Sequence, residues 1–125
     1  MFTRESKLRF FSHFYQLFLQ SHPEIEALFQ HTEFDKQTTI LKHALSMSIM
    51  FAEDDNDLAK SVLTQTRKSH SRSRKNIKPE YYTVWLNSLM HTFWACDPQF
   101  TPSLEKNWRE LLQLAIDYIK EGYEH

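Results

Sequence analysis

The sequence predicts an all-α domain, and three features of its composition and patterning support that class. Only one Gly and four Pro occur among 125 residues, so the chain has few residues that break helices. Leu, Gln, Lys and Glu, which favour helices, are frequent. Apolar residues recur at helical spacing, as in Leu8, Phe11, Tyr15 and Phe18, and do not alternate as in strands. We therefore expect helices and no sheet.

Length and composition exclude several classes of protein. A chain of 125 residues suits one core, and we expect a single domain over residues 1–125. The formal charge of −1 selects neither nucleic acid nor a membrane surface as a partner. The single Cys96 cannot form an internal disulfide, and with the scattered histidines it makes no zinc pattern. Because no run could span a bilayer and no apolar signal segment is evident, we expect a cytoplasmic protein.

The first half of the chain predicts three helices. The first runs from Lys7 to Gln20. A break at Ser21-His22-Pro23-Glu24 then starts a short helix, because Pro suits the first helical position. Residues 31–35 are expected to form a loop, with Asp35 as the N-cap of a helix that ends near residue 51.

The second half predicts three more helices. Acidic residues 53–57 should start a helix that ends at His70, because acids favour the positive end of the helix dipole. A basic loop follows over residues 71–78, and Pro79 opens a long helix that ends at Asp97-Pro98. Thr101-Pro102 caps the last helix. The inner face of that helix is predicted to consist of Leu104, Trp108, Leu111, Leu112, Ala115, Ile116 and Ile119.

Short segments in both halves carry a family resemblance that covers nearly the whole chain. They are Phe14-Tyr15, Phe18, His22-Pro23-Glu24, Leu28-Phe29, residues 32–37, His70, residues 78–82 and Trp108. In order and separation they resemble globins, above all bacterial single-domain haemoglobins and the globin domain of flavohaemoglobins. The resemblance implies a globin fold with a shortened first helix and six to seven helices around a haem pocket.

The resemblance also implies a haem b site with one protein ligand to the iron. His70 matches the proximal ligand, and a neutral imidazole is the commonest haem anchor. Tyr15 and Gln37 match the distal donors, whose O–H and N–H groups stabilise the partial negative charge of bound O₂. Phe29, fourteen residues after Tyr15, would pack against the haem, and Leu41 would form the apolar ceiling of the pocket.

Other residues receive supporting roles from the same resemblance. Tyr82 is available to the proximal histidine, and Phe93 would help to exclude water. Arg72 or Arg74 in the basic loop is expected to pair with a haem propionate. The acid that flavohaemoglobins pair with the proximal histidine aligns near Tyr123, which has an acid on either side.

Taken singly, these residues have simpler explanations. A histidine in the last turn of a helix often only offsets the helix dipole, as His70 could. Tyr15 on an apolar face is usually a core residue, and Gln37 is usually solvated. His31 and His43 are expected to face solvent, and the basic residues after position 66 to form a solvated loop.

The function implied by the resemblance is reversible binding of O₂, NO or CO, for oxygen storage, transport or scavenging. Two alternatives stay open: an NO dioxygenase supplied with electrons by a separate reductase, and a gas sensor that acts on a partner protein. No catalytic residue is assigned, and a dimer formed through the last two helices is a further alternative.

Overall fold

Six helices make up the part of the chain that the computed structural model describes, residues 4–53 and 57–124. They are α1 (Arg4–Gln20), α2 (Pro23–Leu28), α3 (Phe34–Ala52), α4 (Asp57–Ser69), α5 (Pro79–Cys96) and α6 (Pro102–Lys120). No strand occurs in these residues, so the prediction of an all-α fold is confirmed. The acidic turn at residues 54–56 lies outside the described residues.

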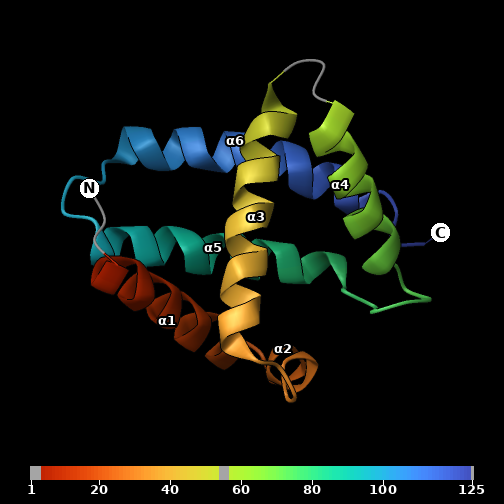
Figure 1. Ribbon diagram of the computed structural model, residues 1–125, viewed down its shortest axis with the longest axis horizontal. Coiled ribbons are helices and arrows are strands. Elements are labelled where there is room, and N and C mark those ends of the chain that lie inside the picture. Colours follow the sequence, from red (N-terminus) through yellow and green to blue (C-terminus); the bar gives the residue numbers. More distant parts are fainter. Residues whose placement is uncertain (1–3, 54–56, 125) are drawn as a thin grey trace.

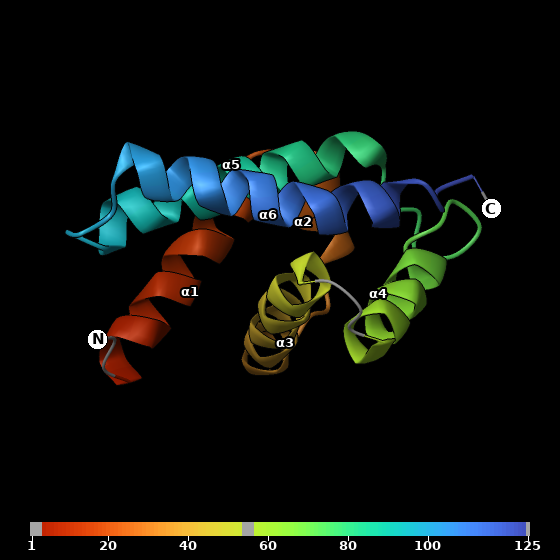
Figure 2. The ribbon, with the colours of Figure 1, turned by 90° about the horizontal axis from the view of Figure 1, so that it is seen from above.

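The helices form two crossing layers (Figures 1 and 2). α5 and α6 lie side by side in one layer, and α1, α3 and α4 cross them in the other. The closest helix pairings include α1 with α5, and both α3 and α4 with α6. None of the described helices is long and apolar enough to cross a membrane.

Local cap chemistry explains where most of the helices begin. Pro stands at the start of α2, α5 and α6, as predicted. Thr101 caps α6, and its Oγ1 accepts a hydrogen bond of 3.1 Å from the backbone N–H of Leu104. The predicted cap of α3 was wrong, because the helix starts at Phe34 and Glu33 is its N-cap. Asp35 lies in the first turn instead, where its charge still suits the helix dipole.

One aromatic-rich core joins the two layers. α1 contributes most to it, because its wide apolar face buries Phe10, Phe11, Phe14, Tyr15 and Phe18. Leu89 and Met90 of α5 and Leu112 of α6 are almost completely buried against this face. Each such side chain contributes about 1.5–3 kcal/mol by burial. The inner face predicted for α6 was wrong at its first position, because Leu104 is 40% exposed.

Candidate functional site

His70 lies directly after α4, where its backbone is held from two directions. Its N–H donates a hydrogen bond of 2.9 Å to the carbonyl oxygen of Thr66, which continues the helical pattern by one residue. Its own carbonyl oxygen accepts a hydrogen bond of 3.1 Å from Ile77. Between these two residues the chain turns at Asn76, whose φ of 54° is in the left-handed region that Asn tolerates. The basic loop therefore holds the backbone of His70 in place, in addition to presenting its own charged side chains to solvent.

The ring of His70 has one nitrogen engaged by α5. Its Nδ1 lies 2.9 Å from Tyr82 Oη, and the two rings stack with centroids 6.2 Å apart. Burial, together with the charge of nearby Lys75, lowers the pKa of His70 to about 4. The imidazole is therefore neutral near pH 7. With the proton on Nδ1, the lone pair is on Nε2, and Nε2 is the nitrogen available to a metal.

Carboxylates near the C-terminus are engaged elsewhere. Glu121 accepts a hydrogen bond of 3.2 Å from Arg67, and Glu124 forms an ion pair of 2.8 Å with Arg72. Within the described residues, no carboxylate forms an ion pair with His70. The partner of the imidazole is therefore the phenol of Tyr82.

Tyr15 and Gln37, both predicted as distal donors, are in contact. The Tyr15 hydroxyl donates a hydrogen bond of 3.2 Å to the backbone carbonyl oxygen of Gln37. Tyr15 is only 6% exposed, and burial raises the pKa of its phenol to about 12, so it keeps its hydrogen. This contact links the inner face of α1 to the first turn of α3. Gln37 is half-buried and lies 22 positions after Tyr15, so this hydrogen bond joins two distant parts of the sequence.

Of the apolar residues predicted for the pocket, Phe29 and Leu41 lie near the Tyr15–Gln37 pair and Phe93 does not. Phe29 is half-buried, with its ring centroid 6.4 Å from Tyr15 and 5.9 Å from Phe18. Leu41, one turn after Gln37, is 4% exposed. The ring of Phe93 stacks instead between α5 and α6, at 5.0 Å from Phe100 and 5.4 Å from Trp108. Phe29 and Leu41 thus lie near the polar pair, whereas Phe93 packs in the α5–α6 part of the core.

Arg72 is exposed and tied to the C-terminal segment. Besides the ion pair with Glu124, its guanidinium lies 5.3 Å from the ring centroid of Tyr123. Its backbone N–H donates a hydrogen bond of 2.8 Å to the Tyr123 carbonyl oxygen. The sequence did not predict these contacts, because they join residues about 50 positions apart that share no helix.

Two histidines that were predicted as structural or exposed form a pair between α1 and α5. The rings of His13 and His91 stack with centroids 6.4 Å apart. His13 Nε2 is buried and has no hydrogen-bond partner. His31 and His43 are exposed, as predicted. The one sign of the His13–His91 pair in the sequence is that both residues fall on helices predicted to pack in the core.

The donor set fits a porphyrin-held iron better than a metal ion held by protein alone. No group of three or more His, Cys, Asp or Glu side chains suited to a metal occurs among the described residues. A single neutral imidazole such as His70 needs further ligands, and a porphyrin supplies four nitrogens of its own. Tyr15 and Gln37 add hydrogen-bonding groups, and Leu41 and Phe29 add apolar surface, which are the groups that a distal haem pocket uses.

Comparison with known proteins gives an independent result. Residues 12–119 match the sequence profile of the Globin family. The fold is similar to the crystal structure of a Pseudomonas aeruginosa PAO1 protein described as structurally highly homologous to a human hemoglobin. The two share 32% sequence identity with a TM-score of 0.87, over 93% of this chain and 86% of that chain. No curated protein matches this chain.

Proposed function

This chain belongs to the globin family, and we propose that it holds haem b through His70 and reversibly binds O₂ and other diatomic gases. The observation that carries the proposal is the contact of 2.9 Å between His70 Nδ1 and Tyr82 Oη, which would leave Nε2 of a neutral imidazole to bind the iron. The haem would supply an iron atom to which the gas molecule binds.

Tyr82 would select the tautomer of His70 that binds the metal. Coordination through Nε2 requires the proton to be on Nδ1, and Tyr82 Oη at 2.9 Å can accept that hydrogen bond. Such a partner fixes the orientation of the ring and increases its basicity. A phenol is a weaker acceptor than a carboxylate, so the imidazole gains less negative character. The weaker hydrogen bond from the imidazole to the Tyr82 phenol favours gas binding over peroxidase-type chemistry.

Tyr15 and Gln37 would supply the hydrogen-bonding groups for the gas molecule. The Tyr15 hydroxyl has one hydrogen, now donated to the Gln37 carbonyl oxygen, and rotation about the C–O bond can redirect it. The Gln37 side chain has N–H donors of its own. A hydrogen bond to a charged acceptor contributes about 1.5–3 kcal/mol, enough to slow dissociation of a polar ligand such as O₂. Phe29 and Leu41 would limit the access of water.

Arg72 already has partners near the C-terminus of the chain. Pairing with a haem propionate requires it to leave Glu124, or to share its guanidinium between two carboxylates. Its present contacts give it a second role, which is to join the basic loop to the end of the chain.

The absorbance spectrum of the purified protein tests the proposal. We expect a Soret band that shifts on reduction with dithionite and again on addition of CO. His70→Ala should lose most of the haem, whereas His43→Ala, at an exposed position of α3, should retain it. A protein that stays colourless after haem reconstitution, or equal haem content in the two variants, would contradict the proposal.

Gas dissociation kinetics test the distal pair separately. Tyr15→Phe should speed the dissociation of O₂ by about 10-fold or more, since a charge-assisted hydrogen bond is lost. CO carries little charge, so its dissociation should change much less. Stopped-flow measurements of both gases on the same variant provide the comparison. Equal changes for O₂ and CO would show that Tyr15 does not donate to the ligand.

A further inference from the structure

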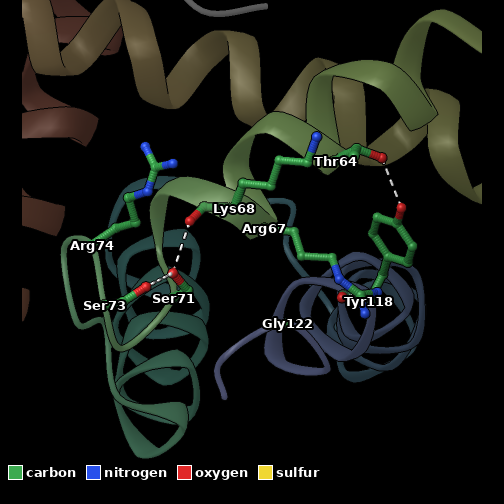
Figure 3. A pocket seen from close by; sticks show the side chains of 8 residues that line it. All are labelled: Thr64, Arg67, Lys68, Ser71, Ser73, Arg74, Tyr118 and Gly122. Carbon is green, nitrogen blue, oxygen red and sulfur yellow. Dashed lines mark hydrogen bonds between the residues drawn. The ribbon is translucent and has the colours of Figure 1, made fainter. Parts of the chain in front are cut away.

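A cavity of about 420 Å³ opens beside α4, the basic loop and the end of α6 (Figure 3). It is lined by Thr64, Arg67, Lys68, Ser71, Ser73, Arg74, Tyr118 and Gly122. Of the residues predicted for haem, only Arg74, the alternative to Arg72 at a propionate, is among these lining residues. The volume is within the range of about 300–1,000 Å³ that is typical of small-molecule sites.

The wall on the α6 side depends on the only Gly of the chain. Gly122 is buried, and a Cβ built on it would lie 2.3 Å from Cγ of Arg67. Its φ is not positive, so the glycine serves close approach and not a special backbone conformation. Arg67 can therefore lie across Gly122 and donate to the Tyr118 carbonyl oxygen at 3.1 Å and to Glu121 at 3.2 Å. This wall is packed in one arrangement before any ligand binds.

Positive charge in the cavity exceeds the negative charge near it. Arg67, Lys68 and Arg74 line it, and no carboxylate is among its lining residues in the described chain. Glu121 offsets only Arg67, whereas no ion pair involving Lys68 or Arg74 is formed with any described residue. In Figure 3 the Arg74 side chain extends upward at the left, and the Lys68 side chain extends up and to the right toward Thr64, so their charged ends lie apart at the rim of the cavity. Two cations are thus free to meet an anion in a protein of net charge −1.

Hydroxyl groups add to the cations at the same place. Ser71 Oγ and Ser73 Oγ are 3.4 Å apart at the mouth of the basic loop. Ser71 Oγ donates to the Lys68 carbonyl oxygen, so Ser73 Oγ is the donor to Ser71 Oγ. Ser73 is exposed, and rotation of its hydroxyl would redirect this long hydrogen bond to a ligand. On the opposite wall, Thr64 Oγ1 and Tyr118 Oη are hydrogen-bonded to each other at 2.7 Å. Polar walls with two free cations suit a compact, multiply charged anion and do not suit an apolar molecule.

We propose that this cavity binds the phosphate group of a small anionic molecule through Lys68, Arg74 and Ser73. A phosphate offers three acceptor oxygens to a guanidinium, an ammonium and a hydroxyl, which a single carboxylate cannot match. The concave shape favours a small molecule over a nucleic acid. The only aromatic ring in the lining, that of Tyr118, is already covered by Arg67 at 4.9 Å. The proposal does not depend on haem or on gas binding.

Titration with pyrophosphate, followed by NMR of the backbone amides and by calorimetry, tests the site. We expect shifts concentrated at residues 71–74 and at Gly122. Lys68→Ala and Arg74→Ala should each weaken pyrophosphate binding about 3- to 10-fold, because each removes one charge-assisted contact. Lys106→Ala removes an exposed cation from the first half of α6, outside the cavity, and should leave binding unchanged. Sodium chloride at equal ionic strength controls for screening.

Sedimentation with phosphatidic acid vesicles distinguishes a soluble phosphate from a lipid headgroup. Pyrophosphate binding that needs Lys68 and Arg74, without vesicle binding, identifies a soluble ligand. Vesicle binding that needs the same two residues identifies the headgroup as the source of the phosphate. The proposal is overturned if neither probe depends on Lys68 and Arg74, or if Lys106→Ala has the same effect as the other two substitutions. Both cavity cations are exposed, so these variants are expected to fold.

Discussion

At the scale of single residues, the hydroxyl of Tyr82 tests how α5 holds the end of α4. Tyr82→Phe removes the partner of His70 Nδ1 and leaves a half-buried polar nitrogen unsatisfied. We expect the free energy of unfolding of the haem-free protein to fall by about 1–3 kcal/mol. Urea unfolding followed by circular dichroism provides the measurement.

Tyr123→Phe is the matched control for that substitution. It removes the same hydroxyl from a hydrogen bond of 2.5 Å to Asn76, but at an exposed site where water replaces the lost partner. Its effect should stay within about 0.5 kcal/mol. Equal losses for the two variants would show that the Tyr82 hydroxyl gives His70 no special support.

His70 itself should make the stability of the haem-free protein depend on pH. Its pKa is about 4 in the folded protein and 6.5 for an unperturbed histidine. Between these values the unfolded chain binds a proton that the folded protein does not, so stability falls as pH falls. From pH 7.5 to pH 5 the loss due to this group should be about 2 kcal/mol.

Urea unfolding of the wild type and of His70→Gln at both pH values isolates that contribution. Gln keeps a polar side chain at the position but does not titrate. The variant should therefore lose about 2 kcal/mol less than the wild type over this range. An identical pH dependence in both proteins would mean that His70 is not held neutral by burial.

At the scale of helices, Gly122 controls how closely α6 and the segment after it approach α4. In Gly122→Ala the new Cβ would meet Cγ of Arg67 at 2.3 Å and Nε at 2.8 Å, so Arg67 must move. Its hydrogen bonds to Tyr118 and Glu121 would be strained or lost. We expect a loss of stability of about 1–3 kcal/mol, which is the usual cost of overpacking.

The clash with Arg67 predicts rescue by a second substitution. In an Arg67→Ala background the obstructing atoms are absent, and Gly122→Ala should then cost much less. A double-mutant cycle of thermal or urea unfolding measures the coupling between the two positions. Additive effects would show that Gly122 is needed for a reason other than to let the Arg67 side chain lie across it.

Helix starts were well predicted because the chemistry that sets them is local. Pro23, Pro79 and Pro102 each begin a helix, and Thr101 caps α6 through a residue three positions on. The start of α3 was placed two residues late, because Asp35 is a better capping residue than Glu33, which forms no side-chain cap bond there. The ring of Phe34 packs against that of Tyr15, with centroids 5.4 Å apart, and this contact favours the earlier start. The capping preference of single residues does not take such packing into account.

At the scale of the whole molecule, the sequence predicted the fold class but not the long-range contacts. Tyr15 and Gln37 were each expected to donate to a bound gas, and the hydrogen bond from Tyr15 to the Gln37 backbone was not predicted. The resemblance to globins supplied the candidate residues, of which Tyr15, Gln37 and Leu41 lie within α1 and α3, while Phe29 and His70 directly follow α2 and α4. The pairing of Arg72 with Glu124 could not be predicted, because it depends on how the basic loop meets the end of α6. The exposure of Leu104 was missed for a similar reason, since helical periodicity does not show where a neighbouring helix ends.

The two layers share one core, so a cavity at its centre should weaken the entire fold. Leu89 of α5 is fully buried in a cluster that includes residues of α1, α3 and α6. Leu89→Ala should cost about 2–5 kcal/mol, a large part of the roughly 5–15 kcal/mol that holds a domain together. Leu114→Ala makes the same change on α6 where the side chain is 53% exposed, and should stay within about 0.5 kcal/mol. The shift in the urea midpoint, at an unchanged dependence of the unfolding free energy on urea, would measure the loss of stability in each variant. Similar losses at the two positions would be incompatible with a single core shared by the layers.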